Sequence, residues 1–321
     1  MKAGKIIATA VLAGSMLLAS TATIAKTVTV AVSQIVEHPA LDAARQGLLD
    51  GLKENGYVEG KNLKFEYKTA QGNPAIAVQI ARQFVGEQPD VLVGIATPSA
   101  QALAAATQSI PIVFTAVTDP VGAKLVSQLQ HPGKNVTGLS DLSPVNQHVE
   151  LMKEILPNLK TIGVVYNPGE ANAVTLVELL KKAAKAQGIK VVEATALKSA
   201  DVQSATQAIA SKSDIIYAPT DNTVASAIDG MIVAANQAKT PVFGGATSYV
   251  KSGAIASLGF DYYQVGQQTA KYVVDILHGK NPGDLPVKVA KGSDLVVNLK
   301  AAKALGITIP KSVLDRATVV K

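Results

Sequence analysis

The same order of strand, polar turn, helix and strand occurs twice in this sequence, at Asp90–Asp119 and at Asp214–Ser248. Each copy begins with an acidic residue and a short apolar run. A polar turn follows, Thr97-Pro98-Ser99 in the first copy and Thr220-Asp221-Asn222 in the second. An alanine-rich stretch, a proline and a second apolar run complete each copy. A repeat of this size predicts two lobes of similar structure.

A strand–helix–strand unit precedes each copy. Val28–Val32 and Leu63–Tyr67 have the β-branched or alternating composition of strands, and Ala40–Glu54 has apolar residues at helical spacing. The same order recurs within residues 161–194. Strands that alternate with helices indicate parallel sheets covered on both faces. The predicted fold class is therefore α/β, with two doubly wound parallel-sheet lobes.

The remaining segments connect or complete these lobes. A strand that crosses from one lobe to the other is predicted over Val136–Leu139. Ser143 is expected to cap the next helix, with Pro144 in its first turn. A helix is predicted over Tyr262–Leu277 and a late strand over Leu295–Asn298.

The first 25 residues have the pattern of a secretory signal peptide. Lys2 and Lys5 form a basic start, and Ile6–Ala19 is an apolar run followed by small residues. Cleavage is expected after Ala25 or after Ala22. A retained membrane anchor is the alternative, but the apolar run is too short to span a bilayer. We therefore expect an exported, periplasmic protein.

Composition excludes several classes of site. The chain has no cysteine, so it has no disulfide, no thiolate metal site, no thiol nucleophile and no cysteine for a lipid anchor. Loss of residues 1–25 lowers the net charge from +6 to +4, an excess too small to indicate nucleic-acid binding. Metal-binding histidine spacing and the GxSxG, Walker and GxGxxG motifs are missing. We expect a binding protein that is not an enzyme and has no cofactor or metal ion.

Six segments carry a family resemblance: HPALDAARQGLLDGLKENGYVEGKN, IATPSAQAL, PIVFTAVTDPVGAKLV, NVTGLS, IGVVYNPGEANA and ASLGFDYYQVGQQTA. Together they resemble substrate-binding proteins of ABC transporters, in the group for tryptophan, tyrosine and other aromatic amino acids. The segments span nearly the whole mature chain.

The resemblance implies the type I periplasmic-binding fold, in which three crossings join two lobes. The implied lobes are residues 27–138 plus 260–282 and residues 139–259 plus 283–321. The implied crossings lie near Gly138, Gly259 and Leu285.

The same resemblance implies the periplasmic component of an ABC importer, which captures a small amino-acid-like ligand by hinge closure. Its partners would be an inner-membrane permease and the associated ATPase, and the protein would be a monomer. An aromatic amino acid is the favoured ligand. A branched-chain amino acid and a thiamine-like or purine-like compound are alternatives, and a ligand sensor for a membrane receptor is an alternative function.

The polar turns supply candidates for the charged ends of such a ligand. Helix N-termini and short hydroxyl side chains suit a carboxylate. We expect Thr97, Ser99 and Thr115 to hold this group, and we include Pro98 of the same turn and Thr118 after the next strand in the predicted site. Asp221 is the candidate for the ammonium, with Asp141 in reserve. Capping of a helix is the alternative role of Thr97 and of Asp221.

The ligand side chain is expected to meet the loops that follow the first strand of each lobe. The candidates there are Gln34, His38, Tyr166 and Asn167, together with Phe260. Tyr166 and Phe260 could stack on an aromatic ring, or could pack in the core or hinge. Asn222 and Ala246, in the second copy of the repeat, complete the predicted site.

Overall fold

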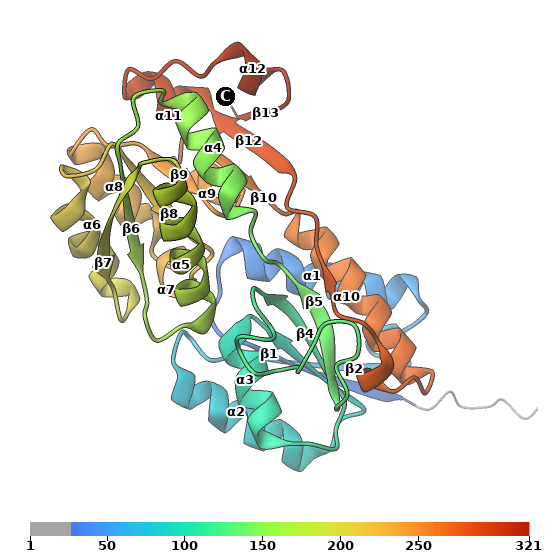
Figure 1. The fold of residues 1–321 in the computed structure, drawn as a ribbon. Helices are drawn as coiled ribbons and strands as arrows, with labels where there is room; N and C mark the ends of the chain where they lie inside the picture. Colours follow the sequence, from blue (N-terminus) through green and yellow to red (C-terminus); the bar gives the residue numbers. More distant parts are fainter. Residues whose placement is uncertain (1–26, 321) are drawn as a thin grey trace, which may run out of the picture.

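The structure is a computed structural model and describes residues 27–320. Two β-sheets, each with helices on both faces, form two lobes that lie one above the other in Figure 1. This arrangement confirms the predicted fold class of two parallel-sheet α/β lobes.

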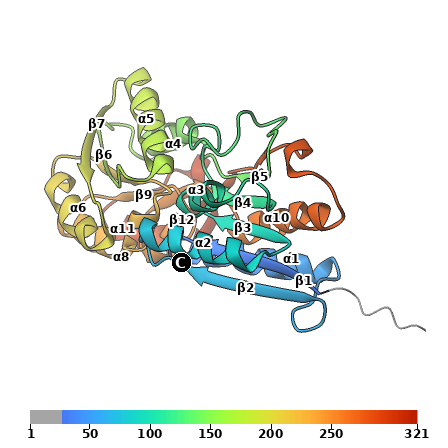
Figure 2. The same ribbon diagram turned by 90° about the horizontal axis from the view of Figure 1, so that it is seen from below.

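The first lobe contains a six-stranded parallel sheet in the order β11-β5-β4-β3-β1-β2. Its strands are β1 Val28–Gln34, β2 Leu63–Thr69, β3 Val91–Ile95, β4 Ile112–Val117, β5 Val136–Ser140 and β11 Lys288–Val289. β2 lies at one edge, beside β1 (Figure 2). The main helices of this lobe are α1 Pro39–Glu54, α2 Pro74–Glu87, α3 Thr97–Ala106 and α10 Tyr262–Leu277, and η2 Pro282–Asp284 is a short 3₁₀ turn.

The second lobe contains a seven-stranded sheet in the order β13-β12-β10-β9-β8-β6-β7. Its strands are β6 Thr161–Tyr166, β7 Lys190–Thr195, β8 Ile215–Ala218, β9 Val242–Gly244, β10 Ala256–Gly259, β12 Asp294–Asn298 and β13 Thr318–Val320. Only the pair β10 and β12 is antiparallel among the described strands. Its longer helices are α4 Val145–Ile155, α5 Ala171–Ala186, α6 Val202–Ala210 and α8 Ile228–Gln237. Its short helices are η1 Ser199–Asp201, α7 Asn222–Ala225, α9 Tyr249–Ser252, α11 Leu299–Ala304 and α12 Lys311–Leu314.

The internal repeat is visible in the hydrogen bonds as well as in the strand order. The sheets share the order β2-β1-β3-β4-β5 and β7-β6-β8-β9-β10, read in equivalent strands. Asp90 Oδ2 accepts the Thr29 N–H at 2.8 Å, and Asp214 Oδ2 accepts the Thr161 N–H at 2.8 Å. The acid that opens each copy therefore attaches its strand to the strand beside it.

Two of the three crossings lie a few residues later in the chain than expected. β5 pairs with β4 and β11 inside the first sheet, so it is not the crossing strand. The chain instead crosses at residues 141–144, 260–261 and 290–293, between elements of different lobes. The expected points near Gly138 and Leu285 were too early because β5 and β11 extend the first sheet.

The three crossings pack against one another. A Cβ atom at Gly292 would lie 2.9 Å from Phe260 Cζ and 3.0 Å from Pro144 Cδ. Each of these residues belongs to a different crossing, and the Phe260 side chain is fully buried. Pro144 precedes α4 as its N-cap residue, and the Ser143 hydroxyl makes no hydrogen bond with any described residue. The predicted Ser143 cap was therefore wrong.

Helix α10 follows the second crossing and packs closely against α1 in the first lobe. A Cβ atom at Gly47 would lie 2.0 Å from the Tyr263 carbonyl oxygen, and one at Gly266 would lie 2.0 Å from that of Ala44. Only glycine allows the two helix backbones to approach this closely. Asp261 caps α10 by accepting the Tyr263 and Gln264 N–H groups at 3.0 and 3.2 Å.

Candidate functional site

A cavity with an empty volume of about 320 Å³ lies between the two lobes. The first lobe and the first crossing contribute His38, Ala40, Leu41, Ala116, Thr118, Asp141 and Tyr262. The second lobe contributes Asn172, Thr220, Asp221, Asn222, Ala225, Ala246 and Tyr249. Most of these residues follow the carboxyl end of a strand, which is where open parallel sheets bind ligands.

His38 enters the cavity from the loop between β1 and α1. The loop is braced by Gln34, whose Nε2 donates to Val36 O and to Asp42 Oδ1, both at 2.8 Å. Burial of the imidazole lowers the pKa of His38 to about 4, although the nearby charge of Asp42 and the Asn222 side chain oppose the shift. The ring is therefore neutral at pH 7. Its Nδ1 is buried and has no hydrogen-bond partner among the described residues.

Asp221 is fully buried and ends the loop that precedes α7. Its Oδ1 accepts the Val224 N–H at 2.9 Å, and its Oδ2 accepts the Asn167 N–H at 2.6 Å. The residue is therefore a helix cap and a cavity-lining acid at the same time. Burial, and then the charge of Glu170, raise the pKa of Asp221 well above its usual range.

Glu170 supports this wall of the cavity from behind. Its Oε1 accepts the backbone N–H and the hydroxyl of Thr223 at 3.0 and 2.8 Å. Its Oε2 accepts the backbone N–H and the side-chain amide of Asn222 at 3.1 and 2.5 Å, and the amide of Asn172 at 3.3 Å. These bonds hold two cavity-lining amides in fixed positions.

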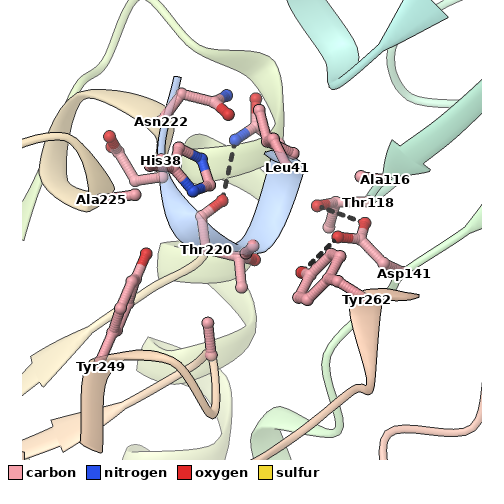
Figure 3. A pocket seen from close by; sticks show the side chains of 14 residues that line it. His38, Leu41, Ala116, Thr118, Asp141, Thr220, Asn222, Ala225, Tyr249 and Tyr262 are labelled. Atoms are coloured by element: carbon pink, nitrogen blue, oxygen red, sulfur yellow. Dashed lines mark hydrogen bonds between the residues drawn. The ribbon is translucent and has the colours of Figure 1, made fainter. Parts of the chain in front are cut away.

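Three buried polar atoms in the cavity wall make no hydrogen bond with any described residue. They are His38 Nδ1, Thr220 Oγ1 and Asn172 Oδ1. The Asn172 amide is oriented by donation from its Nδ2 to Thr220 O at 3.0 Å, a bond drawn in Figure 3. Buried polar atoms are usually paired, so these three atoms are available to hydrogen-bond a polar ligand in the cavity.

Asp141 lines the other side of the cavity, directly after β5. Tyr262 donates its hydroxyl hydrogen to Oδ2 at 2.7 Å, and Thr118 donates to Oδ1 at 3.3 Å. Figure 3 shows this cluster across the cavity from Thr220 and Tyr249. Burial raises the pKa of Asp141, and the bonds from Tyr262 and Thr118 partly offset the shift.

Aromatic and aliphatic surfaces form the rest of the wall. Tyr249 and Tyr262 are buried, and the Tyr249 hydroxyl donates to Pro219 O at 3.2 Å. Leu41 and several alanines also line the cavity. An apolar wall with a few fixed polar groups is the usual composition of a small-molecule site.

Six of the residues proposed from the sequence line this cavity. They are His38, Thr118, Asp141, Asp221, Asn222 and Ala246. The structure thus places Asp221, the reserve candidate Asp141 and His38 around one cavity.

The hydroxyls expected to hold a carboxylate lie behind the cavity wall. Thr115 accepts a hydrogen bond from Thr269 of α10 at 2.8 Å, and the Ser99 hydroxyl lies 3.5 Å from that of Ser33. Ala96, not Thr97, is the N-cap residue of α3, and the buried Thr97 hydroxyl has no partner among the described residues. None of the three expected hydroxyls lines the cavity.

The other expected residues have different positions. Pro98 and Asn167 line a wider groove of about 1060 Å³ between the lobes. Tyr166 donates its hydroxyl hydrogen to Glu193 at 3.1 Å, outside the cavity. Gln34 braces the His38 loop, and Phe260 packs among the crossings.

Sequence reasoning missed Asn172, Tyr249, Tyr262 and the supporting Glu170. Asn172 and Glu170 stand at the start of a helix in the second lobe, where a polar pair could have been flagged by analogy with His38 in the first. Thr220 was noted as part of the polar turn but was not proposed as a ligand contact. No pattern in the sequence singles out the two tyrosines from the others.

Residues 27–320 contain no cluster of three or more histidine, cysteine, aspartate or glutamate side chains that could hold a metal ion. Within the same residues, no helix has the length and apolar character needed to cross a membrane.

The chain is similar in sequence and in structure to known proteins. A tyrosine-binding protein from Clostridioides difficile (strain R20291) is 39% identical over 276 residues, which cover 86% of this chain and 80% of that protein. The solved structure of a conserved domain protein from Vibrio cholerae O1 biovar El Tor is 81% identical, with a TM-score of 0.92, and the match covers 92% of this chain and 100% of that one.

Of two further solved structures, one contains a ligand and the other is ligand-free and open. An ABC domain from Streptococcus pneumoniae in complex with L-Trp is 40% identical, with a TM-score of 0.89 over 92% of this chain and 100% of that one. A ligand-free, open substrate-binding protein from Clostridium difficile is 39% identical, with a TM-score of only 0.70 over 92% of this chain and 99% of that one. The fold of this chain is therefore more similar to the L-Trp complex than to the ligand-free, open protein.

The family model described as ABC transporter substrate binding protein matches residues 29–321. This match includes both lobes, the crossings and the whole wall of the interlobe cavity. It agrees with the two-lobed fold and with a cavity suited to a polar ligand. The chain therefore belongs to the family of ABC transporter substrate-binding proteins, which bind substrates and are not enzymes.

Proposed function

We propose that this chain is the extracytoplasmic substrate-binding component of an ABC importer and captures a free aromatic amino acid in the interlobe cavity. The observation that carries this proposal is the group of unpaired polar atoms beside Asp221, within a cavity that also has two tyrosine walls. The relatives that are named for tyrosine or contain L-Trp support the choice of an aromatic ligand.

The two charged ends of the amino acid would meet different groups. Asp221 and Asn172 Oδ1 are acceptors and would hold the ammonium. The Thr220 hydroxyl and a protonated Nδ1 of neutral His38 are donors and would hold the carboxylate. The rings of Tyr249 and Tyr262 would contact the aromatic side chain.

Capture requires the lobes to open and close about the crossings. The cavity walls come from both lobes, so opening would separate His38 and Tyr262 from Thr220 and Tyr249. The contact among Phe260, Pro144 and Gly292 would act as the pivot. Hinge closure of this kind is common among periplasmic binding proteins.

The partners of the closed protein would be a membrane permease and its ATPase, and the protein would act as a monomer. Export would depend on the signal peptide proposed for residues 1–25, which lie outside the described residues. Mass spectrometry of the exported protein should find a chain that begins after Ala25 or Ala22. Retention of residues 1–25 would contradict this proposal.

Ligand identity is tested with protein that has been unfolded, stripped of bound ligand and refolded. A ligand that binds only the native state raises the free energy of unfolding by RT ln(1 + [L]/Kd). L-Trp or L-Tyr should therefore raise the melting temperature and give saturable heats in calorimetry. L-Leu, thiamine and adenine represent the alternative ligands. A response to one of these, without a response to either aromatic amino acid, would overturn the proposed ligand class.

A further inference from the structure

The cavity has two buried carboxylates and no cationic side chain to balance them. Asp221 is 0% and Asp141 is 3% exposed, and both line the cavity. Neither lysine nor arginine occurs among the described residues of the wall, and His38 is neutral at pH 7. A ligand that closes this cavity must therefore satisfy two acids.

The two acids lie on different sides of the cavity. Asp221 belongs to the second lobe, between Thr220 and Asn222 in the chain, whereas Asp141 forms a cluster with Thr118 and Tyr262. Figure 3 shows this cluster across the cavity from Asn222. An amino acid has a single ammonium, which the proposed function assigns to Asp221.

Asp141 has acceptor capacity that the protein does not use. Its Oδ2 receives the Tyr262 hydroxyl and its Oδ1 receives the Thr118 hydroxyl. An ionised carboxylate has about four acceptor positions, so two bonds leave about half of them open. Covering that open half with a purely hydrocarbon ring would leave a buried charge incompletely paired, which is costly.

We propose that Asp141 accepts a hydrogen bond from the ligand's own ring and that this acid selects aromatic amino acids with a ring donor. An indole N–H and a phenol O–H are such donors, and phenylalanine has none. The inference rests on the proposed function, because it assumes that the ammonium lies at Asp221. It adds a specificity rule that an aromatic pocket alone does not contain.

The test compares ligands of equal shape on the ligand-stripped wild-type protein by calorimetry. L-Trp is paired with 3-(benzothiophen-3-yl)-L-alanine, in which sulfur replaces the ring N–H, and L-Tyr is paired with 4-fluoro-L-phenylalanine. A hydrogen bond to a charged group corresponds to about tenfold to a hundredfold in affinity. We expect each ligand without the donor to bind weaker by that factor.

The variant Asp141→Asn should shrink the difference between the paired ligands by about tenfold or more, because a neutral amide is a weaker acceptor. The matched control is Asp294→Asn, which changes an exposed acid at the start of β12 and should retain the full difference. If Asp141→Asn does not fold, the wild-type comparison decides the question alone.

Equal affinity within both ligand pairs on the wild-type protein would overturn the inference, as would full discrimination in a folded Asp141→Asn variant. In either case tight binding of L-Trp or L-Tyr would leave the proposed function standing. If neither aromatic amino acid binds the wild-type protein, the proposed function fails and the ring-donor rule fails with it.

Discussion

Tyr262 donates its hydroxyl hydrogen to Asp141 across 2.7 Å, and this bond joins two of the three crossings. Asp141 directly follows β5 in the first crossing, and Tyr262 begins α10 after the second. Both residues also line the ligand cavity. A change in the contacts of Asp141 should therefore alter both the cavity wall and the packing of the crossings.

Removal of this hydroxyl in Tyr262→Phe should destabilise the protein. The buried Asp141 would lose a charge-assisted donor, and such a loss costs about 1–3 kcal/mol of unfolding free energy. Denaturant melts without ligand measure this quantity. Tyr263→Phe is the matched control, because its hydroxyl bonds to Asp50 at 3.0 Å in a more exposed setting and its loss should matter less. Equal losses in the two variants would contradict the expectation.

Asp221→Asn should weaken amino-acid binding about tenfold to a hundredfold, because the ammonium would lose its charged acceptor. The unfolding free energy of the variant should change little, because asparagine caps a helix about as well as aspartate and Asp221 caps α7. Asp214→Asn is the control, since Asp214 accepts the N–H groups of Lys160 and Thr161 at 2.8 Å but lies outside the cavity. Calorimetry should show weaker binding only for Asp221→Asn. A variant that binds as tightly as the wild type would leave Asp221 with the capping role alone.

Gly292→Ala should hinder closure of the lobes. The new Cβ atom would lie 2.9 Å from Phe260 Cζ and 3.0 Å from Pro144 Cδ, so the three crossings could not keep their present packing. Small-angle scattering should show that ligand reduces the radius of gyration of the wild type more than that of the variant. In the control Gly86→Ala the new atom meets nothing within 4 Å, and alanine in a helix should instead stabilise α2 by about 0.5–1 kcal/mol. An unaltered ligand response in Gly292→Ala would show that the crossings tolerate the methyl group.

Acid should destabilise the protein through its buried histidines. Burial lowers the pKa of His38 and that of His148 to about 4, below the usual value of 6.5. The unfolded chain then binds more protons as the pH falls from about 6.5 towards 4, so stability is lost in that window. The raised pKa values of Asp141 and Asp221 act in the opposite direction.

The variant His148→Gln isolates one of these contributions. His148 Nε2 lies 2.7 Å from Leu258 O and must donate to it, so Nδ1 accepts the Tyr217 hydroxyl at 3.1 Å in the neutral ring. Below pH 6.5 the unfolding free energy of the wild type should fall more steeply than that of the variant, by up to about 1.4 kcal/mol per pH unit. Denaturant melts between pH 7 and pH 4 measure both slopes. Parallel slopes would mean that His148 does not take up its proton on unfolding.

The internal repeat was sufficient to predict the fold. A strand that is buried on both faces appears in the sequence as a continuous apolar run, which is easy to identify. The short apolar runs that begin the two copies are the strands Val91–Ile95 and Ile215–Ala218, and every residue in them is buried. The helix Tyr262–Leu277 also has its predicted bounds, since Asp261 caps it and its apolar residues have helical spacing. The crossings were harder to place, because β5 has the composition of an interior strand whichever sheet it joins.

The site was predicted in part. Asp221 and His38 follow strand ends, and the topology alone brings such residues to the interlobe face. Thr97, Ser99 and Thr115 also lie near strand ends, yet they are buried behind the cavity wall. A shift of one residue along a strand end turns a side chain to the opposite face, and sequence periodicity cannot fix the turn that decides it. Ala96 illustrates the difficulty, because its φ of 74° is unusual for a residue with a side chain.

The unpaired atoms His38 Nδ1, Thr220 Oγ1 and Asn172 Oδ1 also bear on how an importer avoids ATP hydrolysis without transport. When the lobes close without a ligand, these atoms lose their hydrogen bonds to water and gain no partner in the protein. This loss costs free energy for each atom. If the lobes open and close as proposed, the ligand-free protein would favour the open arrangement and bound ligand would stabilise the closed one. A permease that recognises only the closed shape would bind only the ligand-loaded protein. ATP would then not be hydrolysed when no ligand is bound.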